Sequence, residues 1–174
     1  IVPTTSTSFV MMLCDCLATT IMERKKFTKE NFFLYHKGGN LGSSLRLAKD
    51  IMVTGKKMPV IDHKKSFAEA LKVMSQKKLG IVVITNKRYI KGLVTDGDLR
   101  RVLNNPSKEK DLNKITRNYP LITSENTSAS KALGLMSEKK ITSLLVVSDK
   151  DKNKKNKILK GIIHIHFLLK DRIR

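Results

Sequence analysis

Tryptophan is absent from the 174-residue chain, and aromatic residues make up only 5% of it. The only two cysteines, Cys14 and Cys16, have no further Cys or adjacent His to complete a metal set, and on a helix they point apart, so no disulfide is expected. No apolar run approaches the roughly 18 residues that cross a bilayer. The N-terminus lacks the pattern of a signal peptide. We therefore expect a cytoplasmic protein without a membrane partner, in which both cysteines stay reduced in a core or an interface.

One charge sign is also scarce, because 35 basic residues face 15 acidic ones and leave a net charge of +20. Such a charge raises the possibility of nucleic-acid binding. The basic residues are 27 lysines and only 8 arginines, spread along the whole chain, whereas arginine is the residue suited to bidentate phosphate contacts. Few aromatic residues are available to stack on bases. The pattern favours solvated lysine-rich faces and predicts no nucleic-acid partner.

An internal repeat is the most informative feature that is present. Residues 70–78 (ALKVMSQKK) and 132–140 (ALGLMSEKK) are identical at six of nine positions. Each copy is followed by a β-branched run, at 79–85 and at 141–148, and then by a second apolar run, at 89–103 and at 158–171. Each copy is thus predicted to form strand, helix, strand, strand and helix.

The first helix of the first copy is predicted over 66–78. Phe67, Ala70, Leu71 and Met74 are spaced three and four apart, which places them on one helical face. The strands are too apolar for an exposed sheet face. We therefore expect the two copies to pack on each other as a pseudo-twofold pair.

The first copy ends in GLVTDGDLRR, where Gly92, Thr95 and Asp98 stand at a strand-to-helix junction. One interpretation is a helix cap, because Thr and Asp satisfy free backbone N–H groups at helix starts. The other is a ligand site, because the same N–H groups and the helix dipole suit a phosphate. The two arginines that follow, Arg100 and Arg101, would favour an anion. The junction alone does not decide between these interpretations.

The arrangement over about residues 48–172 resembles a tandem cystathionine-β-synthase (CBS) domain pair, or Bateman module. Gly92, Thr95 and Asp98 match the family signature of Gly, apolar, any, Thr or Ser, any, any, Asp. The resemblance implies that Thr95 contacts the phosphate and Asp98 the ribose of an adenosine nucleotide or similar ligand.

The second copy carries Gly161, His164 and Phe167 at the corresponding positions. Phe167 offers no acceptor for ribose, so we expect one ligand per chain. His164 and His166 are expected to alternate on a strand, but two ligands without a third do not make a metal site, and no metal is predicted.

The first 47 residues follow another pattern. A helix is predicted from the spacing of Val10, Leu13, Leu17 and Ile21, and His36 then precedes a glycine-rich turn, HKGGNLG. The combination of PTTST, F-T-x-E-x-F, H-x-G-G-x-L-G and a CBS pair resembles the C-terminal part of the KpsF/GutQ family of D-arabinose 5-phosphate isomerases.

This resemblance implies an aldose–ketose isomerase that interconverts D-ribulose 5-phosphate and D-arabinose 5-phosphate for Kdo and lipopolysaccharide synthesis. His36 would be catalytic, in general acid–base chemistry, although Lys37 replaces the usual proline of the motif. A complete sugar-isomerase (SIS) domain needs a parallel sheet and a phosphate loop, and neither precedes residue 1, so the chain alone is expected to be inactive.

The predicted fold is therefore α/β, a tandem CBS pair in which each copy is a small β-sheet with two helices. The predicted domains are 1–47, the C-terminal remnant of a SIS domain, 48–110, the first CBS repeat, and 111–174, the second. No cofactor is required, and an adenosine nucleotide or a CMP-Kdo-like effector is expected at the CBS pair. The expected partners are the sugar phosphate, in the full-length protein, and further copies of the chain in a homodimer or homotetramer. The alternative is a stand-alone nucleotide-binding CBS module.

Overall fold

The computed structural model describes residues 2–28, 31–32, 35, 46–105 and 111–170. Within these ranges, two three-stranded sheets have the orders β1-β2-β3 and β4-β5-β6, each with one parallel and one antiparallel strand pair. The predicted order of elements is confirmed in both repeats. The first consists of β1 (Val60–Asp62), α5 (Phe67–Lys77), β2 (Ile81–Asn86), β3 (Tyr89–Thr95) and α6 (Asp96–Leu103). The second consists of β4 (Ile122–Ser124), α8 (Ala129–Glu138), β5 (Ser143–Val147), β6 (Leu159–His164) and α9 (Ile165–Lys170).

Helix α5 begins and ends where its sequence provides caps. The Ser66 hydroxyl accepts a hydrogen bond from the Glu69 backbone N–H, and the Glu69 carboxylate accepts one from the Ser66 N–H, which completes a capping box. The helix stops at Lys78, whose φ of 55° is left-handed. Of the predicted apolar face, Phe67 and Met74 are among the buried residues, as the spacing predicted.

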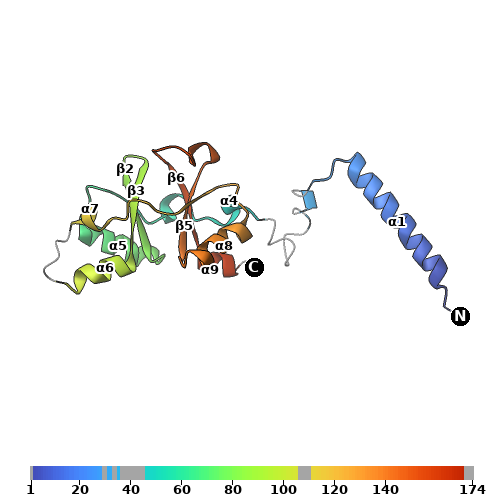
Figure 1. Cartoon of the computed structure of the whole chain (residues 1–174), viewed down its shortest axis with the longest axis horizontal. Helices are drawn as coiled ribbons and strands as arrows, with labels where there is room; N and C mark the ends of the chain where they lie inside the picture. The colour runs from blue at the N-terminus through green and yellow to red at the C-terminus, as the bar shows by residue number, and fades with distance from the viewer. Residues whose placement is uncertain (1, 29–30, 33–34, 36–45, 106–110, 171–174) are drawn as a thin grey trace.

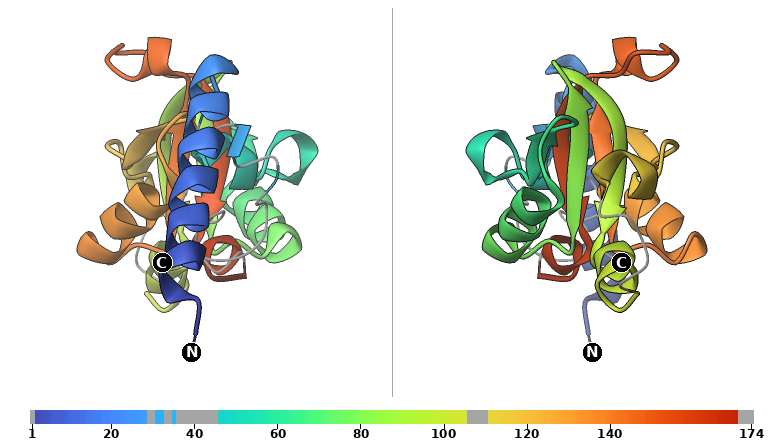
Figure 2. Two further views of the ribbon diagram at one scale, coloured as in Figure 1. Left: turned by 90° about the vertical axis from the view of Figure 1, so that its right-hand side faces the viewer. Right: turned by 90° about the vertical axis from the view of Figure 1, so that its left-hand side faces the viewer.

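The middle strand of each sheet is apolar on both faces because both faces are covered. In β2, Val82 and Ile84 pack with helix residues of the first repeat, whereas Val83 packs against Leu145 of β5 in the second. The strands lie between α5 on one side and α8 on the other (Figure 2). The predicted packing of one repeat on the other is therefore confirmed.

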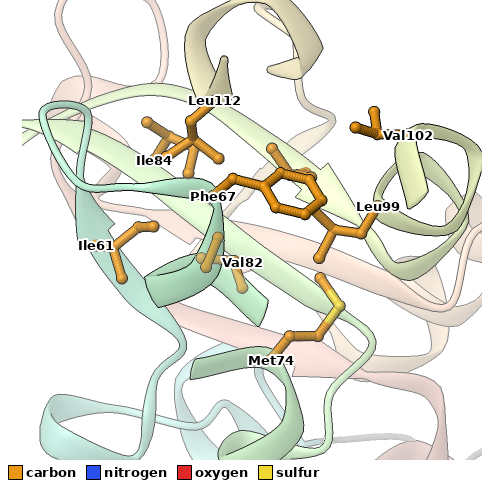
Figure 3. Close-up of a cluster of buried hydrophobic side chains, with 10 residues drawn as sticks. Ile61, Phe67, Met74, Val82, Ile84, Leu99, Val102 and Leu112 are labelled. Carbon is orange, nitrogen blue, oxygen red and sulfur yellow. The ribbon is translucent and has the colours of Figure 1, made fainter. Parts of the chain in front are cut away.

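Three apolar clusters follow from this arrangement. One fills the first repeat, and Figure 3 shows Phe67 and Leu99 at its centre. A second fills the other repeat around Met136 and Ile163. The third lies between the two sheets, and Leu145 is one of its fully buried members.

The repeats also exchange short helices. Helix α4 (Ala48–Ile51) precedes the first repeat in the chain but packs in the core of the second, whereas α7 (Leu112–Ile115) precedes the second repeat and packs in the core of the first. Short 3-10 turns at Gly55–Lys57 and Asp149–Asp151 complete the described elements. Figure 1 shows the two repeats side by side, with α4 beside α8.

The last strand of each repeat pairs with the segment that leads into the other repeat. Leu93 in β3 forms an antiparallel bridge with Arg117, and Ile162 in β6 forms one with Val53. Because each bridge joins a strand of one repeat to the segment before the other, the two repeats are tied together by backbone hydrogen bonds as well as by the shared cluster.

The signature glycine of each repeat leaves room for the segment that pairs with its last strand. We call this the crossing segment. A Cβ on Gly92 would lie 2.3 Å from the carbonyl oxygen of Arg117, and a Cβ on Gly161 would lie 2.3 Å from Sδ of Met52. Neither glycine has a positive φ, so space, and not backbone conformation, requires glycine here.

Helix α1 (Thr4–Arg24) confirms the helix predicted near the N-terminus, but none of its residues is buried. Its apolar residues Val10, Leu13, Leu17 and Ile21 are all more than half exposed. Figure 1 shows the helix standing clear of both repeats. Cys14 and Cys16 are free thiols, as expected, but both are exposed. Of the two expected positions, a core is therefore wrong within the described part of the chain, and an interface stays a prediction.

The same helix is long and apolar enough on average to cross a membrane, by length and composition alone, although it contains no uninterrupted apolar run of that length. Thr4–Arg24 is 21 residues long, which is enough for a membrane span, and none of its residues is buried. A few small polar residues, such as Thr19 and Thr20, interrupt the apolar residues of the helix but leave it apolar on average. Helices from the cores of water-soluble proteins meet the same criterion, so it is weak evidence for a membrane.

Candidate ligand-binding site between the repeats

The signature residues lie at the start of α6, where β3 delivers Thr95 as the N-cap. The Thr95 hydroxyl accepts a hydrogen bond from the Asp98 backbone N–H at 3.3 Å, and Asp98 Oδ2 accepts one from the Thr95 N–H at 3.0 Å. A short bond of 2.6 Å joins the Thr95 hydroxyl to the same carboxylate oxygen. Leu99, which is buried in the first core, anchors the next turn of the helix. The helix-cap interpretation of the junction is therefore confirmed, and it fixes both side chains.

A residue that the sequence analysis missed completes this arrangement. Arg117 donates to both oxygens of Asp98, from Nε to Oδ2 at 3.0 Å and from a terminal nitrogen to Oδ1 at 2.8 Å. Arg101 donates to Oδ1 at 3.0 Å. The expected cation Arg100 pairs instead with Asp96. The bridges Leu93–Arg117 and Val53–Ile162 set Arg117 opposite Val53 in the structure. The sequence repeat, with its offset of 62 residues, sets it opposite Gly55 and gives no signal for its role.

These contacts determine the charge state of Asp98. Burial raises the pKa of this carboxyl, but hydrogen bonds from Arg117 and Thr95 outweigh burial and bring the pKa below its ordinary value. The Asp98 side chain is 10% exposed, whereas that of Arg117 is 55% exposed. The carboxylate is thus an ionised and largely covered group with a cation on its solvent side.

Thr95 and Arg117 line a pocket of about 310 Å³ between the repeats. The second repeat contributes Lys140, Thr142 and Ser143 to its wall. Apolar and aromatic residues complete the lining: Ile81, Leu93, Tyr119, Pro120, Leu121 and Ile141. The two charged lining residues, Arg117 and Lys140, are cations. Small-molecule sites begin at roughly this size and combine an apolar wall with few polar groups, and the charge favours an anionic ligand.

The pseudo-symmetric pocket differs in chemistry. It has a volume of about 290 Å³ and contains Phe167 and Val53, with lysines at its rim. Phe167 stands where the first repeat has Asp98, and Val53 pairs with β6 as Arg117 pairs with β3. Both members of the Asp98–Arg117 pair thus have apolar counterparts, which leaves this pocket without a carboxylate for a sugar.

The two histidines beside this pocket do not alternate on one strand as expected. His164 ends β6, but His166 lies in α9, so this prediction was wrong. Their rings stack with centroids 4.9 Å apart, and His164 Nδ1 accepts a hydrogen bond from the His166 backbone N–H. Burial, and secondarily the neighbouring His166, lower the pKa of His164. Among the described residues, no group of three His, Cys, Asp or Glu side chains is placed to hold a metal.

The predicted catalytic residue, His36, lies outside the described residues, together with the glycine-rich turn that follows it. Gly92, the third residue predicted to bind the ligand, lies beneath the segment that carries Arg117. The described part of the predicted site is therefore Gly92, Thr95 and Asp98, which lie together, with Arg117 as an addition.

These features define a protein class. The profile of the CBS domain family matches residues 48–105 and 110–166, and the chain belongs to this family. Its fold is also that of solved CBS pairs. CBSX2 in complex with AMP has a TM-score of 0.59 at 21% identity, over 71% of this chain and 93% of that one. The CBS pair of protein MJ0100, in complex with 5′-methylthioadenosine and S-adenosyl-L-methionine, has a TM-score of 0.62 at 19% identity, over 72% of this chain and 94% of that one.

More specific similarity extends beyond the repeats. The arabinose 5-phosphate isomerase KdsD of Yersinia pestis is 39% identical over 97% of this chain. KdsD of Escherichia coli strain K12 is 36% identical over the same share. The chain spans about half the length of these two relatives. The resemblance to D-arabinose 5-phosphate isomerases is thereby confirmed for nearly the whole chain.

Proposed function

We propose that this chain is the C-terminal regulatory portion of a D-arabinose 5-phosphate isomerase, and that its CBS pair binds one small anionic effector per chain. The observation that supports the first part is the similarity to KdsD, which covers 97% of the chain and so includes the residues before the CBS repeats. A stand-alone CBS module, the alternative, has no need of those residues.

In this proposal, the full-length protein interconverts D-ribulose 5-phosphate and D-arabinose 5-phosphate in the cytoplasm for Kdo and lipopolysaccharide synthesis. His36 takes part in moving the proton between the two substrate carbons. The 174-residue chain is inactive alone. No cofactor is required.

The effector is proposed to bind in the pocket beside Thr95 and Asp98. Solved CBS pairs of the same fold hold AMP in one case and adenosine derivatives in another, and the cationic pocket suits a phosphate. Thr95 and the start of α6 would then hold the anionic group, and the Asp98 carboxylate would accept hydrogen bonds from ribose hydroxyls. A CMP-Kdo-like effector combines the same two features, a ribose and an anion.

Calorimetric titration with AMP and with CMP-Kdo tests this site. We expect one binding event per chain with at least one of these two ligands. Asp98→Asn should then weaken binding about ten- to a hundredfold, because a hydrogen bond to a charged group contributes roughly 1.5–3 kcal/mol. Phe167→Leu, at the pseudo-symmetric position, is the matched control and should leave affinity unchanged. Two equivalent sites per chain, or an Asp98→Asn protein with the affinity of the wild type, would contradict the proposal.

The isomerase proposal has its own experiment. In a full-length version, His36→Ala should lower turnover of D-ribulose 5-phosphate by roughly 10²–10⁴-fold, as is usual for a general acid–base group. The 174-residue chain should show no turnover. Unchanged kinetics in the His36→Ala enzyme would remove this residue from the active site, whatever the CBS pair binds.

Assembly into a homodimer or homotetramer belongs to the same proposal. The exposed apolar residues of α1, among them Phe9, Leu13 and Leu17, would be buried by the rest of the isomerase or by another copy. The net charge of +20 opposes association only weakly, because charges more than about 8–10 Å apart are largely screened at physiological salt. A monomer in light scattering at high micromolar concentration would contradict this part.

A further inference from the structure

The Asp98 carboxylate already has as many hydrogen-bond donors as it can use. Oδ2 accepts from the Thr95 N–H, the Thr95 hydroxyl and Arg117 Nε, and Oδ1 accepts from Arg117 and Arg101. A carboxylate offers about four lone-pair sites, and five donors converge here. A ribose hydroxyl reaches this carboxylate only if one of these donors leaves.

Arg117 is the donor that a ligand in the pocket displaces, because Arg101, although more exposed at 66%, does not line the pocket, and Thr95 is fixed as a helix cap. Thr95 is the N-cap of α6, and Arg101 reaches Asp98 from within the same helix. Arg117 comes from a different segment, its side chain is 55% exposed, and it lines the pocket. Its backbone is held in place by two hydrogen bonds with Leu93, at 2.9 and 3.1 Å. The guanidinium therefore moves while its backbone stays in place. The exchange loses a bidentate contact with a largely covered carboxylate, and a new bidentate partner must offset that loss.

A released Arg117 needs a new anion. The pocket's other charged lining residue is the cation Lys140, so the pocket itself offers the guanidinium no carboxylate in place of Asp98. A ligand with both a ribose diol and a phosphate satisfies both groups at once, because arginine binds phosphate bidentately as it binds carboxylate. An uncharged nucleoside displaces Arg117 without giving it a partner.

We infer that Arg117 is the specificity-determining residue of this site. It occupies the sugar-binding carboxylate in the free protein and is exchanged onto the ligand's phosphate on binding, so that the pocket selects nucleoside phosphates against the corresponding nucleosides. The inference rests on the proposed binding of a nucleotide-like effector at Asp98. The opposite pocket supports treating the two residues as a unit, because Phe167 and Val53 replace both of them there.

Titration calorimetry with AMP and with adenosine tests this exchange. The wild type should bind AMP at least about tenfold more tightly than adenosine. In Arg117→Met, which keeps an apolar stem but removes the charge, AMP should bind more weakly and adenosine more tightly, and the preference for AMP should fall about tenfold. Arg88→Met removes an exposed arginine in the turn after β2 and should leave the preference unchanged. Thermal unfolding checks that each variant is folded.

The outcomes separate the two proposals. If the wild type binds AMP but Arg117→Met keeps the same preference over adenosine, the exchange is refuted and the nucleotide site stands. If the wild type binds neither AMP nor adenosine, this inference is refuted, and the titration with CMP-Kdo decides separately whether the proposed effector site stands. Should Arg117→Met fail to fold, Arg117→Lys replaces it. Lysine keeps the charge but not the bidentate geometry, so the adenosine affinity should still rise, and an adenosine affinity equal to that of the wild type would refute the exchange.

Discussion

Replacing Gly92 with alanine should destabilise the protein by about 1–3 kcal/mol, although the change adds a single methyl group. The new Cβ would lie 2.3 Å from the Arg117 carbonyl oxygen and 2.5 Å from Cγ2 of Thr116. The nearest obstacle is backbone, so no rotamer change relieves it.

The magnitude follows from the two ways in which the structure can respond. If the crossing segment stays in place, the strain resembles that of an overpacked core, which typically costs about 1–3 kcal/mol. If it moves away, the two hydrogen bonds between Leu93 and Arg117 are lost, at about 0.5–1.5 kcal/mol each. The two costs do not add. Movement of the segment removes the strain, and a segment that stays in place keeps its hydrogen bonds.

Two further glycines provide controls within the same chain. Gly161→Ala meets the Met52 side chain, with Sδ at 2.3 Å, and because methionine is flexible we expect a smaller loss of about 1 kcal/mol. Gly134→Ala in α8 has no atom within 4 Å and should stabilise the helix by about 0.5–1 kcal/mol.

Urea unfolding followed by circular dichroism measures all three free energies. We expect the free energy of unfolding to increase in the order Gly92→Ala, Gly161→Ala, wild type and Gly134→Ala. A Gly92→Ala protein as stable as Gly161→Ala would refute the argument that the nature of the obstacle, backbone or side chain, sets the cost.

Two other predictions concern side chains. Asp98→Asn should remove a pH-dependent part of the free energy of unfolding. Contacts with Arg117 and Thr95 lower the pKa of Asp98 from its ordinary 3.8. The stability that the Asp98 carboxylate contributes is therefore present above about pH 4 and is lost as pH falls through the folded-state pKa. Urea unfolding at several pH values should show the wild type and the variant converging in acid, and a constant difference would contradict this. Ser66→Ala should cost more than Ser128→Ala, within the roughly 0.5–2 kcal/mol of a helix cap. Ser66 also receives a return contact from Glu69, whereas Ser128 accepts from the Lys131 N–H at 3.3 Å and lies 3.4 Å from the Ser130 hydroxyl without a return contact from Lys131. Equal losses by the same assay would contradict the comparison.

The repeat and the apolar periodicity were sufficient to predict the order of strands and helices. Helix α5 was expected over 66–78 and spans Phe67–Lys77, because Ser66 and the apolar face both encode it locally. The pairing of the two sheets was also predictable, since strands without a polar face must be covered on both sides.

The missing part of the prediction was long-range. Arg117 follows Asp98 by 19 residues, and only the three-dimensional bridge between Leu93 and Arg117 brings them together. The exposure of α1 was likewise not predictable, because its helical spacing shows an apolar face and says nothing of what covers it. His166 was misplaced because a strand and the first turn of a helix are not distinguished by two alternating residues.

Because α4 and α7 are exchanged between the repeats, the two cores are completed at different times during synthesis of the chain. The first core is complete in sequence once Leu112 has been made, since its other buried members precede it. The second core takes Ala48 and Ile51 from early in the chain and must wait for Ile163 and Leu168 near its end. On the ribosome, the first core therefore gains all its buried residues while α4 still lacks the surface on which it packs. We expect the N-terminal repeat to fold first, and the last strand and helix to complete both the second core and the cluster between the sheets.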